Sequence, residues 1–159
     1  MIHVRNAVPA DLDRICQFNQ SLALETENRT IPADVLRAGV EAALLSGDKL
    51  HYWVAVSPDA PDLPVGQVAV SYEWSDWRNG WIWWLQSVYI DSQWRGRGVF
   101  RCILEQVKAD AQADGQVIGL RLYMEHDNHG ARATYEKMGF TPAGYEVLEA
   151  MWADQTVRS

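Results

Sequence analysis

Residues 83–100 constrain the fold more than any other part of the chain. Residues 83–90 are mostly aromatic or β-branched and contain neither Gly nor Pro, which is typical of a strand. A turn follows at 91–95, and Gly96 and Gly98 then lead into a helix. The apolar positions of that helix recur at helical spacing: Val99, Phe100, Ile103, Leu104, Val107 and Ala111. The stretch therefore predicts a strand, a glycine turn and a helix in immediate succession.

Such a junction is an anion site. The first N–H groups of a helix lack intrahelical partners, and the helix dipole adds a partial positive charge there. Glycines at positions 96 and 98 let the main chain approach a phosphate without an intervening Cβ. Arg95, Arg97 and Arg101 add cationic side chains. We therefore expect a phosphate-bearing ligand that is held largely by main-chain amides.

The remaining elements predict a mixed sheet covered by helices. Asn79-Gly80 is a strong signal for a two-residue hairpin between two antiparallel strands. The strand–helix–strand order across 83–125 predicts a parallel βαβ unit. Strands are expected at 2–5, 50–56, 65–74, 81–90 and 117–125, with one or two closing strands in 140–152. Helices are expected at 9–24, 32–44, 98–114 and 128–138, with a polar connection at 25–30 and a loop at 57–64.

Two motifs decide which ligand the glycine turn serves. The chain lacks the Gly-Lys-Ser/Thr ending of a P-loop, and position 101 is Arg where a dinucleotide fingerprint has Gly. The Gln-x-x-Gly-x-Gly pattern at 93–98 instead resembles the acyl-CoA pyrophosphate loop of the GNAT family of N-acyltransferases. A second stretch resembles the family pattern Asn-x-x-Ala-x-x-x-Tyr-x-x-x-Gly-Phe, carried here by Asn128, Ala131, Tyr135, Gly139 and Phe140.

The resemblance covers nearly the whole chain and implies a fold and a cosubstrate. The implied fold is α/β, with a central mixed, mostly antiparallel sheet of six to seven strands flanked by four helices, in one domain over 1–159. The implied acyl donor is acetyl-CoA, with no metal. Pantetheine would pair with the main chain at 88–90, and the pyrophosphate would lie on the amides at 95–100. The residues that the resemblance assigns to acyl-CoA are Val88, Tyr89, Ile90, Gln93, Arg95, Gly96, Arg97, Gly98, Val99, Phe100, Asn128 and Tyr135. Phe100 departs from the Gly or Ala usual in the family, so it either turns into the core or reshapes the pyrophosphate approach.

The implied reaction is attack of an amine on a thioester. The leaving thiolate needs a proton, and a Tyr hydroxyl is protonated at neutral pH. Tyr135 lies two helical turns after Asn128 and is the expected general acid. The attacking amine must be neutral, so a base or a water relay is useful. Glu25, Glu27 and Glu73 are the candidate bases, with substrate recognition or solvated charge as the alternative for each.

Composition narrows the function classes. A net charge of −7 disfavours general nucleic-acid binding and suits a cationic acceptor. No apolar run approaches the length of a membrane span, and residues 1–5 lack the apolar core of a signal peptide, which predicts a cytoplasmic protein. Cys16 and Cys102 are expected to be reduced thiols.

Two other clusters have more than one interpretation. His126, Asp127 and His129 suit a polar loop and helix cap better than a metal site, because no further ligand is near in sequence. The Trp residues at 74, 77, 81, 83 and 84 alternate along the hairpin, so half should pack in the core and half could line an acceptor pocket or an interface.

The expected function is therefore transfer of an acetyl group from acetyl-CoA to a primary amine of a small molecule or peptide. A non-catalytic acyl-CoA sensor with the same cleft is the alternative. No nucleic-acid or membrane partner is expected, and the Trp-rich surface hints at a homodimer.

Overall fold

The computed structural model describes residues 1–152 and 157–158. A five-stranded sheet has the order β1-β3-β4-β5-β6 and is antiparallel except for the β5–β6 pair. Its strands are β1 (His3–Asn6), β3 (His51–Ser57), β4 (Ala60–Ser75), β5 (Gly80–Ile90) and β6 (Val117–Leu122). A separate two-stranded pair joins β2 (Arg29–Thr30) to β7 (Val157–Arg158).

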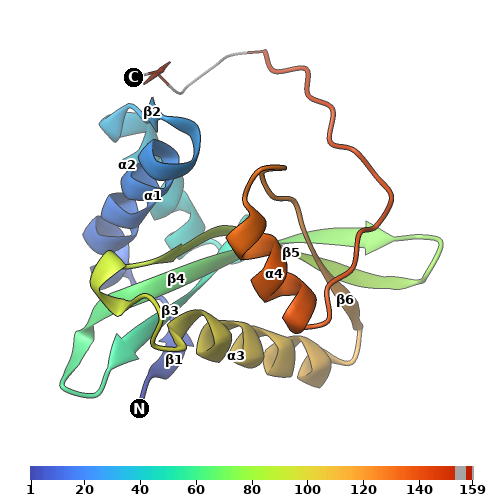
Figure 1. Ribbon diagram of the computed structural model, residues 1–159, viewed down its shortest axis with the longest axis horizontal. Helices are drawn as coiled ribbons and strands as arrows, with labels where there is room; N and C mark the ends of the chain where they lie inside the picture. The colour runs from blue at the N-terminus through green and yellow to red at the C-terminus, as the bar shows by residue number, and fades with distance from the viewer. Residues whose placement is uncertain (153–156, 159) are drawn as a thin grey trace.

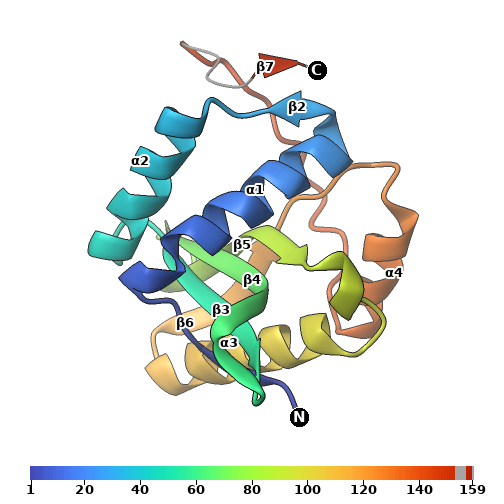
Figure 2. The ribbon, with the colours of Figure 1, turned by 90° about the vertical axis from the view of Figure 1, so that its left-hand side faces the viewer.

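Helices cover both faces of the sheet (Figures 1 and 2). The four α-helices are α1 (Leu12–Glu27), α2 (Ala33–Leu45), α3 (Val99–Asp114) and α4 (His129–Lys137), with short 3₁₀ turns at Pro9–Asp11 and Ser92–Trp94. On one face, Ile15 of α1 and Val40 of α2 pack on Val54 and Ala69. On the other face, α3 buries Val99, Ile103, Leu104 and Val107 against β3, β4 and β5. The apolar residues that recur at helical spacing in the sequence therefore form the face that α3 buries.

The mixed sheet, the four helices and the hairpin confirm the expected fold. Asn79 lies in the left-handed region (φ 50°), as a tight turn between antiparallel strands requires. The β5–α3–β6 unit is parallel, with Leu85 opposite Leu122. Trp83 packs against Trp53 on the α3 side, whereas Trp84 contacts Tyr123 on the other face, so the hairpin aromatics do divide between the two faces.

Four element predictions were wrong. The expected polar connection at 25–30 is instead the end of α1, which continues to Glu27, and β2 (Arg29–Thr30). Residues 140–152 contain no strand, so the main sheet has five strands rather than six or seven. Strand propensity in this segment is not enough, because a strand also needs a partner edge. The expected strand 117–125 ends at Leu122, and the expected loop 57–64 is a tight turn at Pro58-Asp59 followed directly by β4. The prolines in this region are tolerated because Val56 and Pro64 pair across a register shift, where the ladder is already irregular.

Candidate active site

β5 loses one of its two neighbours halfway along its length. β5 pairs with β4 as far as Ile90, but it pairs with β6 only over Trp81–Leu85. Beyond Leu85 the β6-facing main chain of β5 has no strand partner among the described residues. The residues expected to pair with pantetheine, Val88, Tyr89 and Ile90, lie on this unpaired length. An extended ligand could add to it as a further strand.

A buried amide holds a bulge at the point where the two strands diverge. Ser87 has a positive φ of 52°, and the β4–β5 register shifts between Gln67 and Ala69. The Nε2 of the fully buried Gln67 donates to the carbonyl oxygen of Ser87 (3.0 Å) and to Asn19 Oδ1 (2.9 Å). Gln67 Oε1 has no partner among the described residues. The contacts of Gln67 with Asn19 and Ser87 were not expected from the sequence, although a Gln within an apolar strand could have indicated them.

The glycine turn and the start of α3 have the expected geometry for an anion site. Asp91 accepts the amide of Gln93 at 2.9 Å, and Arg14 donates to the same carboxylate at 2.7 Å, so the entry to the turn is anchored. Gly96 and Gly98 have φ of 74° and 77°, and a Cβ at either position would meet no atom within 4 Å. The first helical hydrogen bond from this end joins Cys102 N to the Gly98 carbonyl, which leaves the amides of residues 99–101 outside the helical ladder.

The three arginines expected around the phosphate differ in their partners. Arg95 pairs with Glu25 at 2.7 Å and lies over the Tyr89 ring, and Arg101 pairs with Glu105 at 2.8 Å. Arg97 lies over Trp94 and has no ion pair within the described residues. Arg97 is therefore the cation of this loop that is available to a phosphate without breaking an ion pair to the described residues. Val99 is buried, so only its main chain can take part.

Phe100 turns inward and contacts the expected general acid. Its ring meets the Tyr135 ring edge-on at 5.4 Å, and the Phe140 ring also meets Tyr135 edge-on, at 5.5 Å. Burial raises the pKa of Tyr135 to about 12. The hydroxyl makes no hydrogen bond within the described part of the chain. Asn128 caps α4 by accepting the amide of Ala131 at 3.1 Å, so the helix that carries both residues starts where the sequence predicts.

The three candidate bases have different surroundings. Glu25 accepts from the Tyr89 hydroxyl and from Arg95, both at 2.7 Å. Burial acts to raise the pKa of Glu25, but these hydrogen bonds outweigh it and the pKa lies below its usual range. Glu73 pairs with Arg121 at 2.7 Å, and Glu27 is exposed near the end of α1. Glu25 and Glu73 are thus already paired carboxylates, which disfavours both as bases in this state.

An acidic cavity of about 570 Å³ opens at the end of α1. Residues 24–29 and Glu125 line it, so Glu25, Glu27 and Glu125 face the same space, with Arg29 as the cation of the lining. Glu125 and Arg121 were not expected from the sequence. Arg121 was detectable in principle, because it is the charged residue of the otherwise apolar β6. Its guanidinium lies near the rings of Trp84 (5.9 Å) and Tyr145 (5.8 Å).

Other features of the chain fall outside this site. Cys16 and Cys102 are free thiols, both half-buried. Within residues 1–152, no group of three or more His, Cys, Asp and Glu side chains is placed to hold a metal ion. Among the described residues, no helix is long and apolar enough to cross a membrane.

Comparison with known proteins gives a consistent family. A model of the acetyltransferase (GNAT) domain matches residues 48–142. A possible acetyltransferase from Clostridium difficile 630 is 40% identical in sequence, covers 97% of this chain and 99% of its own, and superposes with a TM-score of 0.87. No curated protein sequence gave a significant match.

Two more distant structures share the fold. A GCN5-related N-acetyltransferase from Ralstonia eutropha JMP134 is 17% identical over 94% of this chain and 99% of its own, with a TM-score of 0.73. Glucosamine-6-phosphate N-acetyltransferase from Arabidopsis thaliana is 16% identical over 94% and 98%, with a TM-score of 0.69. Together with the domain match, the diverging strands and the glycine turn place the chain in a known group: it belongs to the GNAT family of acetyltransferases.

Proposed function

We propose that this chain, acting as one domain over residues 1–159, transfers an acetyl group from acetyl-CoA to a primary amine. The observation that carries the proposal is the unpaired length of β5, which leads directly into the glycine turn and the amides at the start of α3. A ligand with an amide-bearing arm and a pyrophosphate matches these two features in order. Val88, Tyr89 and Ile90 would pair with the arm, and residues 95–100 would hold the pyrophosphate, with Gln93 and Asn128 at the edges of the site.

Tyr135 is the proposed donor of a proton to the leaving thiolate. With a pKa of about 12, its hydroxyl stays protonated throughout the physiological range. A thiol has a pKa of about 8.5, so complete transfer from Tyr135 to a free thiolate is uphill by roughly 5 kcal/mol. We therefore expect the Tyr135 hydroxyl to hydrogen-bond to the sulfur as negative charge develops on it during C–S cleavage, and the proton released by the amine to balance the one taken up by the thiolate. The amine's nitrogen forms the new C–N bond and releases its own proton.

The acceptor is proposed to be a cationic amine of a small molecule or a peptide. The cavity lined by Glu25, Glu27 and Glu125 supports this, because carboxylates attract an ammonium group to the cleft. The net charge of −7 acts in the same direction. Glu27 is the proposed base, directly or through water, because no ion pair to the described residues occupies its carboxylate. Glu25 and Glu73 are instead proposed to bind and orient the amine substrate.

A turnover assay tests the proposal. Wild type should release CoA thiol from acetyl-CoA in the presence of cationic primary amines. Tyr135→Phe should lower kcat by about 100-fold, within the usual range for one general acid, and leave the acetyl-CoA Kd within about twofold. Tyr72→Phe is the matched control, because Tyr72 is also half-buried but lies in the β4–β5 sheet away from α4. Full activity in Tyr135→Phe would remove Tyr135 from this role.

The second candidate is a cytoplasmic acyl-CoA sensor with no turnover. The Arg95–Glu25 pair favours this alternative. The pair connects the glycine turn to α1, so a ligand that binds at the turn would also change the contacts of α1. Acetyl-CoA binding without thiol release across an amine panel would support the sensor. Thiol release that depends on both substrates would support the enzyme.

A further inference from the structure

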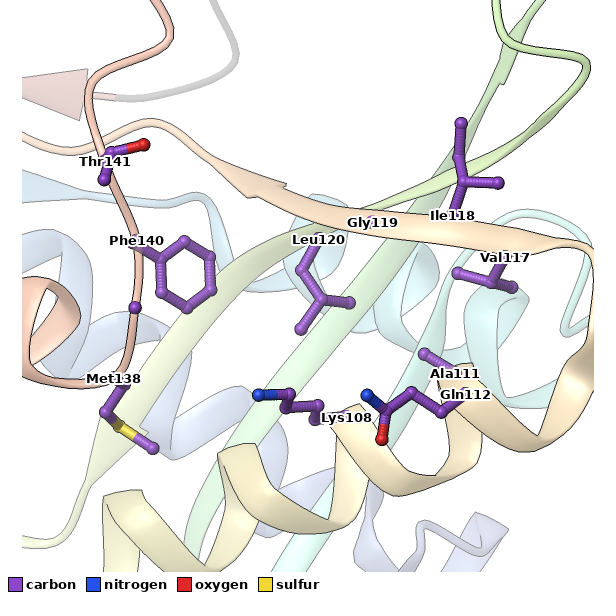
Figure 3. A pocket seen from close by; sticks show the side chains of 11 residues that line it. Lys108, Ala111, Gln112, Val117, Ile118, Gly119, Leu120, Met138, Phe140 and Thr141 are labelled. Atoms are coloured by element: carbon purple, nitrogen blue, oxygen red, sulfur yellow. The ribbon is translucent and has the colours of Figure 1, made fainter.

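The cavity beside β6 does not account for the course of β5. This cavity, of about 390 Å³, lies between β6, α3 and the turn at 138–141. Figure 3 shows Leu120, Met138 and Phe140 around it, with Lys108 on the α3 side. None of its described lining residues belongs to β5. The constraint on residues 86–90 that the structure does show lies on the side of β4.

β5 carries a bulge opposite β4. Between the pairs made by Gln67 and by Ala69, two residues of β5, Ser87 and Val88, face one residue of β4. Ser87 also has a φ of 52°, which is unfavourable for a residue with a Cβ. A bulge bends the strand that carries it. This bulge lies just beyond Leu85, where the pairing with β6 ends, so it sets the direction of the unpaired length of β5.

The side-chain amide of Gln67 holds this bulge. Its Nε2 donates to the Ser87 carbonyl oxygen at 3.0 Å and to Asn19 Oδ1 at 2.9 Å. A carbonyl can only accept, so turning the amide round would place two oxygens together. The Ser87 carbonyl and the Val88 N–H belong to one planar peptide and point in opposite directions. The bond that draws the carbonyl toward Gln67 therefore directs the Val88 N–H away from it.

Two more side chains fix the position of the Gln67 amide. Asn19 is buried on α1, and its Nδ2 donates to the Tyr52 hydroxyl of β3 at 3.2 Å. Burial raises the pKa of Tyr52, and contacts with Asn19 and with the Ser87 side chain act in the opposite direction. The four residues come from α1, β3, β4 and β5. The bulge is thus connected to three elements that surround it.

This arrangement is unfavourable for packing alone. Gln67 is fully buried, and its Oε1 has no partner among the described residues. A buried polar atom without a partner destabilises the fold. Positions 65 and 68–70 of the same strand are all Val or Ala, so an apolar side chain would suit this part of β4 better. The amide at position 67 is therefore better explained by the peptide that it holds than by its contribution to the core.

We infer that Gln67 is a positioning residue of the acyl-CoA site, which holds Ser87 in its left-handed conformation and so keeps the main chain of residues 88–90 directed at the ligand. Asn19 supports this role by fixing the Gln67 amide. Gln67 acts through the main chain of β5 and not by contact with the ligand. The inference rests on the proposed function, because it concerns the pairing of acyl-CoA with residues 88–90.

Isothermal titration calorimetry with acetyl-CoA tests the role of the amide. Gln67→Met keeps the length of the side chain and removes its hydrogen bonds. Residue 87 should then relax toward an ordinary strand conformation, and the affinity should fall by about 5- to 30-fold, which is the equivalent of the left-handed penalty. The double variant Gln67→Met/Ser87→Gly should bind within about threefold of wild type, because glycine adopts a positive φ without help.

Val40→Ala is the matched control for lost stability. Val40 is buried on α2, on the same face of the sheet, and takes no part in the hydrogen bonds around Ser87. Its truncation should destabilise the chain and leave the acetyl-CoA affinity within about twofold of wild type, since the site is independent of it. Far-UV circular dichroism shows that each variant folds.

The outcomes separate this inference from the proposed function. Unchanged affinity in Gln67→Met, with normal binding by wild type, would overturn the inference alone. A loss that Ser87→Gly does not recover would also overturn it, because Gln67 would then act through packing. Absence of acetyl-CoA binding by wild type would overturn the proposed function and this inference with it.

Nuclear magnetic resonance of wild type tests the same contacts without a variant. The Nε2 protons of Gln67 should exchange with solvent at least about 100-fold more slowly than those of the exposed Gln112, because both of the Gln67 bonds lie in the interior. Exchange as fast as at Gln112 would overturn the inference, even where Gln67→Met fails to fold.

Discussion

Replacement of Gly98 by Glu tests the anion site at the start of α3. Gly98 has a φ of 77° and open space around its Cα, so the new side chain meets no neighbour but must adopt a left-handed conformation. That conformation costs about 1–2 kcal/mol for a residue with a Cβ. For a chain of this size the melting temperature should therefore fall by roughly 2–8 °C.

The effect on the ligand should be much larger than the effect on stability. A carboxylate roughly 5 Å from a phosphate charge is repelled by about 3 kcal/mol at an effective dielectric constant near 20. This corresponds to a loss of affinity of at least about 100-fold. Isothermal titration calorimetry with acetyl-CoA and with CoA measures it directly.

Gly115→Glu separates the two effects. Gly115 has the same φ of 77° and the same open space, but it lies at the other end of α3. The helix dipole favours an anion at the N-terminus and opposes one at the C-terminus by about 0.3–1 kcal/mol. Gly115→Glu should therefore be the less stable variant and yet bind acetyl-CoA normally. Equal affinity of Gly98→Glu and wild type, or an equal loss in both variants, would refute the assignment of the pyrophosphate to this turn.

Two further predictions concern ion pairs. Asp11→Ala should lower the free energy of unfolding by about 2–4 kcal/mol, because Asp11 is buried and its loss leaves Arg5 without a partner. Asp13→Ala removes an exposed pair with Arg37 and should cost much less; urea unfolding compares the two variants. Glu25→Gln should cost less than about 1 kcal/mol, since the pair with Arg95 is half exposed. Because folding lowers the pKa of Glu25, this stabilisation is fully present above the ordinary carboxyl pKa of about 4.3 and is lost as pH falls through the lower folded value. Unfolding curves of wild type and Glu25→Gln should therefore differ at pH 7 and converge in acid, and a difference that persists in acid would contradict the pairing.

The turns and the helix cap were predicted correctly from the sequence, because one short segment determines each of them. The glycines at 96 and 98 have the positive φ that the turn requires, and Asn79 does the same for the hairpin. Asn128 caps α4 where the pattern places it. In each case the preference resides in residues that are adjacent along the chain, so no knowledge of distant contacts was needed.

Contacts between distant segments were not readable. Arg95 was expected to face the phosphate, but it pairs with Glu25, which is far away in sequence and close only after α1 has packed on the sheet. The Glu73–Arg121 pair likewise depends on β4, β5 and β6 lying side by side. The expected closing strands failed for a related reason. The sequence of 140–152 expresses a preference for extended structure, but it does not say which edge satisfies that preference.

Glu25 lies between the proposed acyl-CoA site and the acidic cavity proposed for the amine. Its carboxylate receives the Tyr89 hydroxyl from β5 and Arg95 from the phosphate turn, and it also lines the acidic cavity. A pyrophosphate at the proposed site would compete with Glu25 for Arg95, because both are anions. Loss of Arg95 would leave Glu25 with a weaker set of donors and raise its pKa toward the ordinary value. Binding of the acyl donor would then make this carboxylate more basic and more attractive to an ammonium group. If the proposed site is correct, we expect acetyl-CoA to bind before the amine.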